Sequence, residues 1–148
     1  MQNRRNYYNS MTNIEKTLFN KDFFSIQEKR KEIIEAVLQP LLLLFDKLHL
    51  TKDELFLIID EAVTNAMEHG NHWDSSKKIM VKTTIDSDSI KISIADEGRG
   101  FVHGNYMKRI PERNILSTRG RGLYIINQFC DISWNTAGNE ILLIFKLK

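Results

Sequence analysis

Cysteine, net charge and long apolar runs are all scarce in the 148-residue sequence, and each scarcity excludes a class of protein. The single cysteine, Cys130, rules out an intramolecular disulfide and favours a reducing compartment. A formal net charge of +2 is too small to indicate nucleic-acid binding. No apolar run reaches the roughly 18 residues of a membrane-spanning helix, and the opening MQNRRNYYNS lacks the apolar centre of a signal peptide. These features predict a cytoplasmic protein that contacts neither nucleic acid nor a membrane directly.

Length and composition predict one globular domain. Hydrophobic residues make up 42% of the chain and charged residues 27%, which suits a chain of this length with its own core. The polar N-terminus predicts a flexible tail at 1–11, and we expect residues 12–148 to form a single domain.

Residues 54–71, ELFLIIDEAVTNAMEHGN, have the apolar spacing of an amphipathic helix. Thr51 and Glu54 have the spacing of a capping box, which would begin this helix. Gly70 is placed to end it as a C-terminal cap. The rest of the chain is arranged around this segment, because it combines the most regular apolar pattern with several polar side chains.

Glu61 and Asn65 lie one helical turn apart, at the edge of the apolar face. A carboxylate can act as a general base or a metal ligand, and a carboxamide oxygen can bind a hard cation. The pair therefore predicts chemistry over this side of the helix. The alternative is an ordinary solvated flank of a surface helix, which would carry the same residue types.

Other segments show the periodicity of short strands and helices. Clustered antiparallel strands with helices on one face predict an α+β fold, a two-layer sandwich with a mainly antiparallel sheet. The run LLLLF at 41–45 suits either a deeply buried helix or a partner-binding surface. The predicted elements are an edge strand at 12–19, a helix at 25–48 interrupted by Pro40, a hairpin at 78–86 and 90–96, a helix at 123–129, and a hairpin at 131–135 and 141–147.

Asp96 falls on the same face of its strand as the isoleucines at 90, 92 and 94, which are expected to be buried. A core-facing carboxylate costs several kcal/mol unless it is hydrogen-bonded. Its partner is either a nearby turn or the amino group of a ligand. The sequence continues as DEGRG at 96–100, where Gly98 and Gly100 permit a sharp turn and a close backbone approach to a ligand.

A long basic segment, 101–119, shows no clear periodicity and leads into glycines that open a helix. Such a helix start can bind an anion, because free backbone N–H groups and the positive end of the helix dipole face the same point. The segment is therefore interpreted as a lid over a phosphate, with a flexible solvated loop as the alternative. Its cationic residues are Lys108, Arg109, Arg113 and Arg119.

Three motifs in this order resemble those of the GHKL (Bergerat-fold) ATPases. EAVTN at 61–65 with EHG at 68–70 resembles the N box, DEGRG at 96–100 the G1 box, and GRGL at 120–123 the G2 box. The resemblance covers residues 12–148. Within the superfamily, the short chain and the EAVTNAxxHG pattern are most similar to anti-sigma factor serine kinases of the RsbW/SpoIIAB type.

The resemblance implies a role for each motif. Glu61 would be the catalytic residue that orients or deprotonates the attacking hydroxyl group, and Asn65 would hold Mg²⁺ at the nucleotide phosphates. Asp96 would accept a hydrogen bond from the adenine amino group. The implied nucleotide-binding residues are Asn65, Asp96, Gly98, Gly100, Arg119, Gly120, Arg121, Gly122 and Leu123.

The implied function is that of an ATP-dependent protein serine/threonine kinase. It would transfer the γ-phosphate to an anti-anti-sigma protein of the STAS type and would also bind a sigma factor. ATP, ADP and Mg²⁺ are the implied ligands, and a homodimer is the implied assembly.

One departure from the family pattern leaves other hypotheses open. Members often carry a Gly-Thr pair in the last hairpin, where the threonine supports adenine binding, whereas Gly138 is followed here by Asn139 and Glu140. A nucleotide-dependent regulatory module with little or no kinase activity is therefore the alternative. The expected fold would also allow the catalytic half of a split histidine kinase.

Overall fold

The computed structural model describes residues 14–100 and 118–148. The predicted tail at 1–11 lies outside the described residues, as does residue range 101–117 of the predicted lid. No helix within the described residues is both long enough and apolar enough to cross a membrane.

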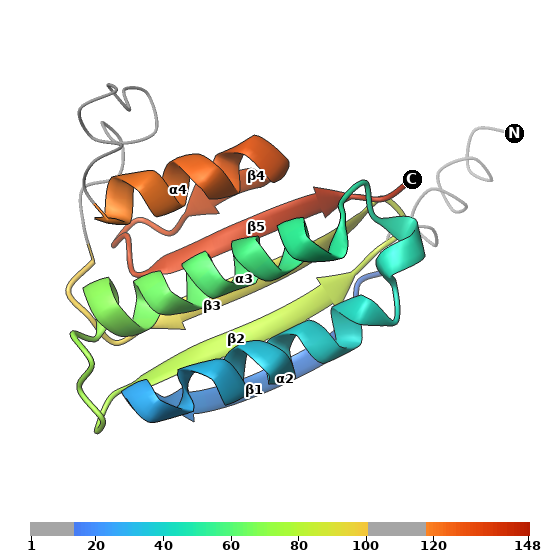
Figure 1. Ribbon diagram of the computed structural model, residues 1–148. Coiled ribbons are helices and arrows are strands. Elements are labelled where there is room, and N and C mark those ends of the chain that lie inside the picture. The colour runs from blue at the N-terminus through green and yellow to red at the C-terminus, as the bar shows by residue number, and fades with distance from the viewer. Residues whose placement is uncertain (1–13, 101–117) are drawn as a thin grey trace, which may run out of the picture.

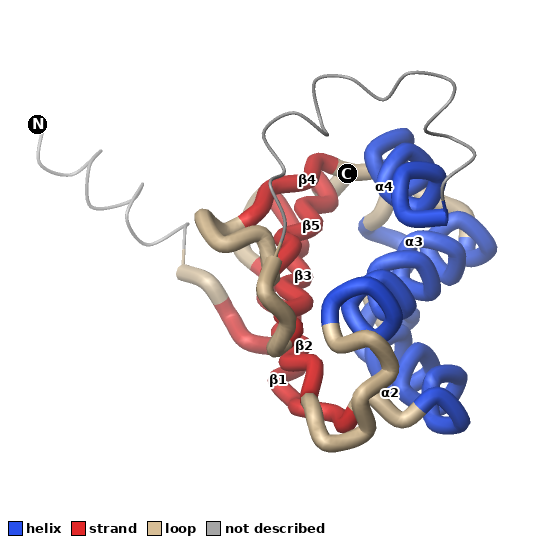
Figure 2. The backbone as a smooth tube through the Cα atoms, turned by 90° about the vertical axis from the view of Figure 1, so that its left-hand side faces the viewer, coloured by secondary structure: helices blue, strands red, loops and turns tan. Residues whose placement is uncertain are grey.

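Among the described residues, five antiparallel strands form one sheet and three α-helices cover one of its faces (Figure 1, Figure 2). The strands stand in the order β1-β2-β3-β5-β4. This arrangement confirms the predicted α+β two-layer fold. The strands are β1 Lys16–Phe24, β2 Lys78–Ile85, β3 Ser89–Asp96, β4 Asp131–Trp134 and β5 Glu140–Lys146; the helices are α2 Arg30–Leu42, α3 Lys52–Asn65 and α4 Thr118–Phe129.

Helix α3 lies between α2 and α4 over the sheet, and its apolar face is fully buried (Figure 2). The apolar positions predicted for this helix are thus confirmed as core positions, and so are the three isoleucines at 90, 92 and 94 on β3. A helix anchored along one whole face keeps the polar residues at the rim of that face in fixed positions. The buried residues concerned are Leu55, Ile58, Ile59, Ala62 and Val63 on α3, and Ile79, Val81, Ile90, Ile92 and Ile94 on the sheet.

Two predicted boundaries are wrong. The edge strand runs over Lys16–Phe24 rather than 12–19. Its pairing with β2 shifts between Thr17 and Phe19, and an irregularity of this kind breaks the alternation from which a strand is recognised. Helix α4 begins at Thr118 rather than at 123, so the end of the predicted lid is helical.

The predicted helix at 25–48 is shorter in the structure. Helix α2 ends at Leu42, two residues after Pro40, and a short 3₁₀ turn follows at Phe45–Lys47. The leucines of the LLLLF run differ in environment, because Leu41 is fully buried whereas Leu43 is 85% exposed. The run is therefore neither wholly core nor wholly surface.

The predicted capping box begins α3. The backbone N–H of Glu54 donates to Oγ1 of Thr51 at 3.1 Å, and the backbone N–H of Thr51 donates to Oε2 of Glu54 at 2.8 Å. Two N–H groups that the helix itself cannot satisfy are thereby paired.

Thr51→Ala is expected to lower the free energy of unfolding by about 1 kcal/mol, the usual effect of removing an N-cap hydroxyl. Urea denaturation followed by circular dichroism measures the change. Ser75→Ala is the control, because this exposed serine lies in a turn with no helix to cap, and it should change stability by less than about 0.5 kcal/mol. Equal effects of the two substitutions would contradict the capping assignment.

The prediction that Gly70 is the C-terminal cap is wrong, because Gly70 lies within the helical segment and Asn71 is the cap. Helix α3 continues into a π-helical turn, Ala66–Gly70, closed by a hydrogen bond of 2.9 Å from the N–H of Asn71 to the carbonyl of Ala66. The left-handed residues that follow are His72 and Trp73, with φ of 51° and 56°. Gly70 is needed for another reason, which lies in its contact with the end of β3.

Candidate functional site

Glu61 and Asn65 are half-buried at the edge of α3 and lie against the beginning of α4. A Cβ atom added to Gly122 would lie 2.5 Å from Oε2 of Glu61 and 3.3 Å from Nδ2 of Asn65. A side chain at Gly122 would therefore displace the carboxylate. The structure thus brings the first and third sequence motifs into direct contact.

The carboxamide of Asn65 has an unusual environment. Its Nδ2 atom is buried and has no hydrogen-bond partner among the described residues. A buried polar group without a partner costs about 1–3 kcal/mol, so a ligand that supplies the missing bond would be bound preferentially. Rotation of the amide by about 180° would instead present its oxygen, which is a ligand type that Mg²⁺ accepts.

No group of three or more His, Cys, Asp or Glu side chains suited to a metal occurs within residues 14–100 and 118–148. A divalent cation at Asn65 would therefore take most of its ligands from substrate phosphates and water, which is how Mg²⁺ is commonly held. The donor set fits Mg²⁺ on that condition, since Asn65 supplies one neutral ligand and Glu61 lies beside it.

Asp96, at the end of β3, separates two hollows. One is a cleft of about 370 Å³ that is also lined by His69 and Gly138, a volume within the range of about 300–1,000 Å³ typical of small-molecule pockets. The other is an apolar recess that reaches Asn65 and Trp134. Its free space of about 10 Å³ is close to that of a single water molecule. The roomier side of Asp96 is therefore the cleft.

Gly70 and Gly98 pack against Asp96 with almost no free space. The N–H of Gly98 donates to Oδ1 of Asp96 at 2.8 Å, so the carboxylate caps the turn that follows it. A Cβ atom on Gly70 would lie 2.2 Å from Cγ of Asp96, and one on Gly98 would lie 2.2 Å from the carbonyl oxygen of Gly70. Both positions require glycine because the end of the π-helical turn packs directly on this loop. A carboxylate has about four acceptor sites, so it can accept from more than one donor at a time.

A family model described as the histidine kinase-like ATPase domain matches residues 32–145, which include all three motifs. The chain belongs to this family. The resemblance to GHKL ATPases that the motifs indicated is thereby confirmed.

Curated relatives are similar over part of their length. An anti-sigma F factor from Oceanobacillus iheyensis is 32% identical over 80 residues, which cover 53% of this chain and 55% of that protein. The serine-protein kinase RsbW from Bacillus licheniformis is 29% identical over 85 residues, 53% of each chain. An anti-sigma F factor from Clostridium perfringens is 31% identical over 95 residues, covering 60% of this chain and 68% of that protein. The chain spans about half the length of the first two relatives.

The last hairpin departs from the family pattern in sequence but still supports the Asp96 loop. The N–H of Asp96 donates to the backbone carbonyl of Asn139 at 2.9 Å. Gly100 has φ of 76°, and a Cβ atom there would lie 1.8 Å from the carbonyl oxygen of Ala137. The support comes from backbone atoms, so asparagine in place of the family's threonine does not remove it.

The third motif is divided between the first turns of α4 and the core. Arg119, Gly120 and Arg121 belong to the first turn of α4, while Leu123 is buried at 1% exposure. Leu123 therefore packs α4 onto the sheet. The assignment of these residues to nucleotide binding stays a prediction, and Lys108, Arg109 and Arg113 lie outside the described residues.

The sequence does not single out Asn71, which is only the last residue of the predicted helix 54–71. The side chain is fully buried and hydrogen-bonds to three separate segments. The only local signal is its position directly after Gly70, which says nothing of its partners. Contacts that join distant segments are not visible in a local pattern.

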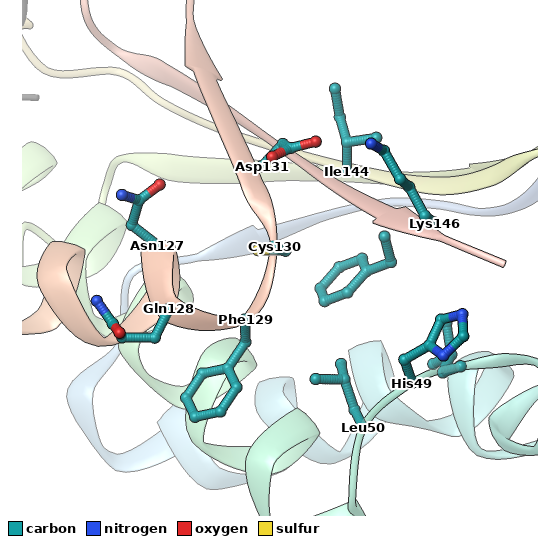
Figure 3. Close-up of a pocket in the computed structure, with 11 residues that line it drawn as sticks. His49, Leu50, Asn127, Gln128, Phe129, Cys130, Asp131, Ile144 and Lys146 are labelled. Atoms are coloured by element: carbon teal, nitrogen blue, oxygen red, sulfur yellow. The ribbon is translucent and has the colours of Figure 1, made fainter. Parts of the chain in front are cut away.

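A separate cavity of about 290 Å³ lies at the other end of α4, among His49, Leu50, Phe129 and Cys130 (Figure 3). None of the residues predicted for nucleotide binding lines it. Burial, and to a smaller extent the nearby Asp131 carboxylate, raises the pKa of the Cys130 thiol to about 12. Cys130 therefore remains a neutral thiol at physiological pH and is not an activated nucleophile.

Proposed function

We propose that the chain binds ATP with Mg²⁺ and transfers the γ-phosphate to a serine or threonine of an anti-anti-sigma protein of the STAS type. It would also bind a sigma factor. The observation that carries the proposal is the meeting of Glu61 and Asn65 on α3 with Gly122, near the start of α4. Asp96 and Asn65 line the same small recess, so the two ends of the proposed nucleotide site lie close together.

Each residue has a task that suits its environment. Asp96 would accept the adenine amino group, because its carboxylate is held in place by the Gly98 N–H and lines the roomier cleft. The start of α4 would bind phosphate oxygens through its free N–H groups. Asn65 would bind the cation or a phosphate with its carboxamide, whose Nδ2 atom has no hydrogen-bond partner among the described residues. Mg²⁺ would neutralise charge on the phosphate oxygens, as in other phosphoryl-transfer sites.

Glu61 would act on the attacking hydroxyl group of the partner's serine. Its carboxylate lies beside Gly122, where the phosphates are expected to bind, and an acceptor there can orient the hydroxyl and take its proton. Phosphoryl transfer depends mainly on positioning and charge neutralisation. One oriented carboxylate is therefore enough to act on the attacking hydroxyl group.

The proposed partners rest on the relatives. Proteins named anti-sigma F factor and serine-protein kinase RsbW are similar to this chain over about half of its length. A sigma factor and a STAS-type protein are therefore the partners to test first. Homodimerisation and a cytoplasmic location, both expected from the sequence, remain predictions.

Isothermal titration with ATP and with ADP tests the nucleotide site. Wild-type protein is expected to bind both in the presence of Mg²⁺, and Asp96→Asn to weaken binding by about 10- to 100-fold, as for loss of a charge-assisted hydrogen bond. Asn65→Ala is expected to remove the dependence of affinity on Mg²⁺. Asp88→Asn, in an exposed turn between β2 and β3, is the matched control and should bind like wild type. Absence of nucleotide binding by wild type would refute the proposal.

The second candidate is a nucleotide-dependent regulatory module without kinase activity. The replacement of the family's threonine by Asn139 favours it in sequence. Because the backbone carbonyl of Asn139 still holds Asp96, the two candidates share the same nucleotide site and differ only in chemistry. Phosphate transfer to a STAS-type protein distinguishes them.

A further inference from the structure

The buried Asn71 side chain connects the end of β1, the start of β2 and the loop after β3. Its Nδ2 atom donates to Oγ of Ser25 at 2.7 Å and to the carbonyl of Lys78 at 2.9 Å. Its Oδ1 atom accepts the backbone N–H of Glu97 at 2.8 Å. We propose that Asn71 is a positioning residue that sets the direction of Asp96 and thereby the selectivity of the site for adenine. This inference rests on the proposed nucleotide-binding function.

The network permits only one orientation of the Asn71 carboxamide. Both of its N–H groups are used by acceptors on one side, and a rotation by 180° would turn an N–H group toward the N–H of Glu97. The loop that it holds is closed a second time, because Oε2 of Glu97 accepts the N–H of Lys78 at 2.7 Å. Fully satisfied buried networks of this kind are rigid.

The held N–H group belongs to the peptide unit that joins Asp96 to Glu97. Asn71 thus holds the backbone on the C-terminal side of Asp96. On the N-terminal side, the N–H of Asp96 donates to the carbonyl of Asn139 at 2.9 Å. With both neighbouring peptide units held, the direction of the Asp96 side chain is determined before any ligand arrives. The bond from Gly98 to its Oδ1 atom completes the arrangement.

A purely structural role and a positioning role predict different behaviour. Substitution of a purely structural residue lowers stability, but the protein that does fold keeps the same preference for one base over another. Substitution of a positioning residue changes the preference between bases. The Asp96 carboxylate accepts a hydrogen bond from a 6-amino group and repels a 6-oxo group only when it points at the base. Inosine triphosphate, which carries the 6-oxo group, is therefore the discriminating ligand.

The experiment measures the affinity of full-length protein for ATP and for inosine triphosphate by titration. Wild type is expected to prefer ATP by about tenfold or more, and Asn71→Ser to prefer it by less than about threefold. Ser25→Ala is the matched control, because it removes the far end of the same network and leaves the bond to Glu97 in place. It should retain the wild-type preference at a comparable loss of stability.

The outcomes separate this inference from the proposed function. Binding of neither nucleotide by wild type would refute the proposed function and this inference with it. Wild-type preference retained in folded Asn71→Ser would overturn the inference alone. Amide hydrogen exchange of unliganded wild type gives a test that needs no variant, in case Asn71→Ser does not fold. The Glu97 amide is expected to exchange as slowly as amides within β3, and rapid exchange would overturn the inference.

Discussion

Glu61→Gln is expected to lower the rate of phosphate transfer by about 10²- to 10⁴-fold, the range for loss of a general base. Glutamine has nearly the same size as glutamate, so its fit against Gly122 should be preserved. ATP should still bind, and any change should be toward tighter binding because one negative charge near the phosphates is lost. The rate is measured in single-turnover reactions of ATP-loaded protein with purified STAS-type proteins, followed by the phosphoserine formed.

The control for this substitution is Glu35→Gln, which removes the same charge from an exposed position on α2. It should transfer phosphate at the wild-type rate. Transfer by Glu61→Gln at the wild-type rate would show that Glu61 is not the base. If wild type binds ATP but transfers no phosphate to any STAS-type partner, the regulatory module becomes the better description.

The order and type of the elements could be predicted because apolar periodicity is a local property. Residues 54–71 show this most clearly, since the buried positions of α3 are those that the spacing predicted. Asp96 could be singled out in the same way, because its strand alternates and it follows three buried isoleucines. A carboxylate in that position has few structural explanations, which makes it a useful signal of a site.

The start of α4 could not be predicted because tertiary contact overrides local propensity there. Glycine is among the poorest helix formers, and two glycines at 120 and 122 suggested a loop ahead of the helix. The structure includes both in α4, where Gly122 lies against the Glu61 and Asn65 side chains. Absence of a side chain allows the two helices to approach, so the same residue that weakens the helix makes the site possible.

The roles of Gly70 and Asn71 depend on residues that are distant in sequence. Asn71 bonds to Ser25, 46 positions away, and to Glu97, 26 positions away. Gly70 contacts Asp96, and its position at the end of a predicted helix offered a local explanation that was wrong. Single-sequence patterns report local geometry, so they located the site and missed the packing that holds it.

Gly70→Ala is expected to weaken ATP binding by about 10- to 100-fold, the effect of losing a hydrogen bond to a charged group. The added methyl group would lie 2.2 Å from Cγ of Asp96, so the carboxylate must move away from its position. The free energy of unfolding should fall by about 1–3 kcal/mol, as for other overpacked positions. Titration with ATP and urea denaturation measure the two effects. Wild-type values for both would contradict the packing argument.

A double-variant cycle shows whether the damage passes through Asp96. The three atoms nearest to the added methyl group are Cγ, Oδ2 and Oδ1 of Asp96, and Asp96→Ala removes all of them. Gly70→Ala combined with Asp96→Ala should therefore be nearly as stable as Asp96→Ala alone, with a coupling free energy of about 1–3 kcal/mol. Additive losses would instead mean that the methyl group acts on other neighbours of Gly70. Strong coupling would mean that Gly70, although it belongs to the first motif, serves the second motif. Its function would be to leave room for the Asp96 carboxylate that binds the adenine base.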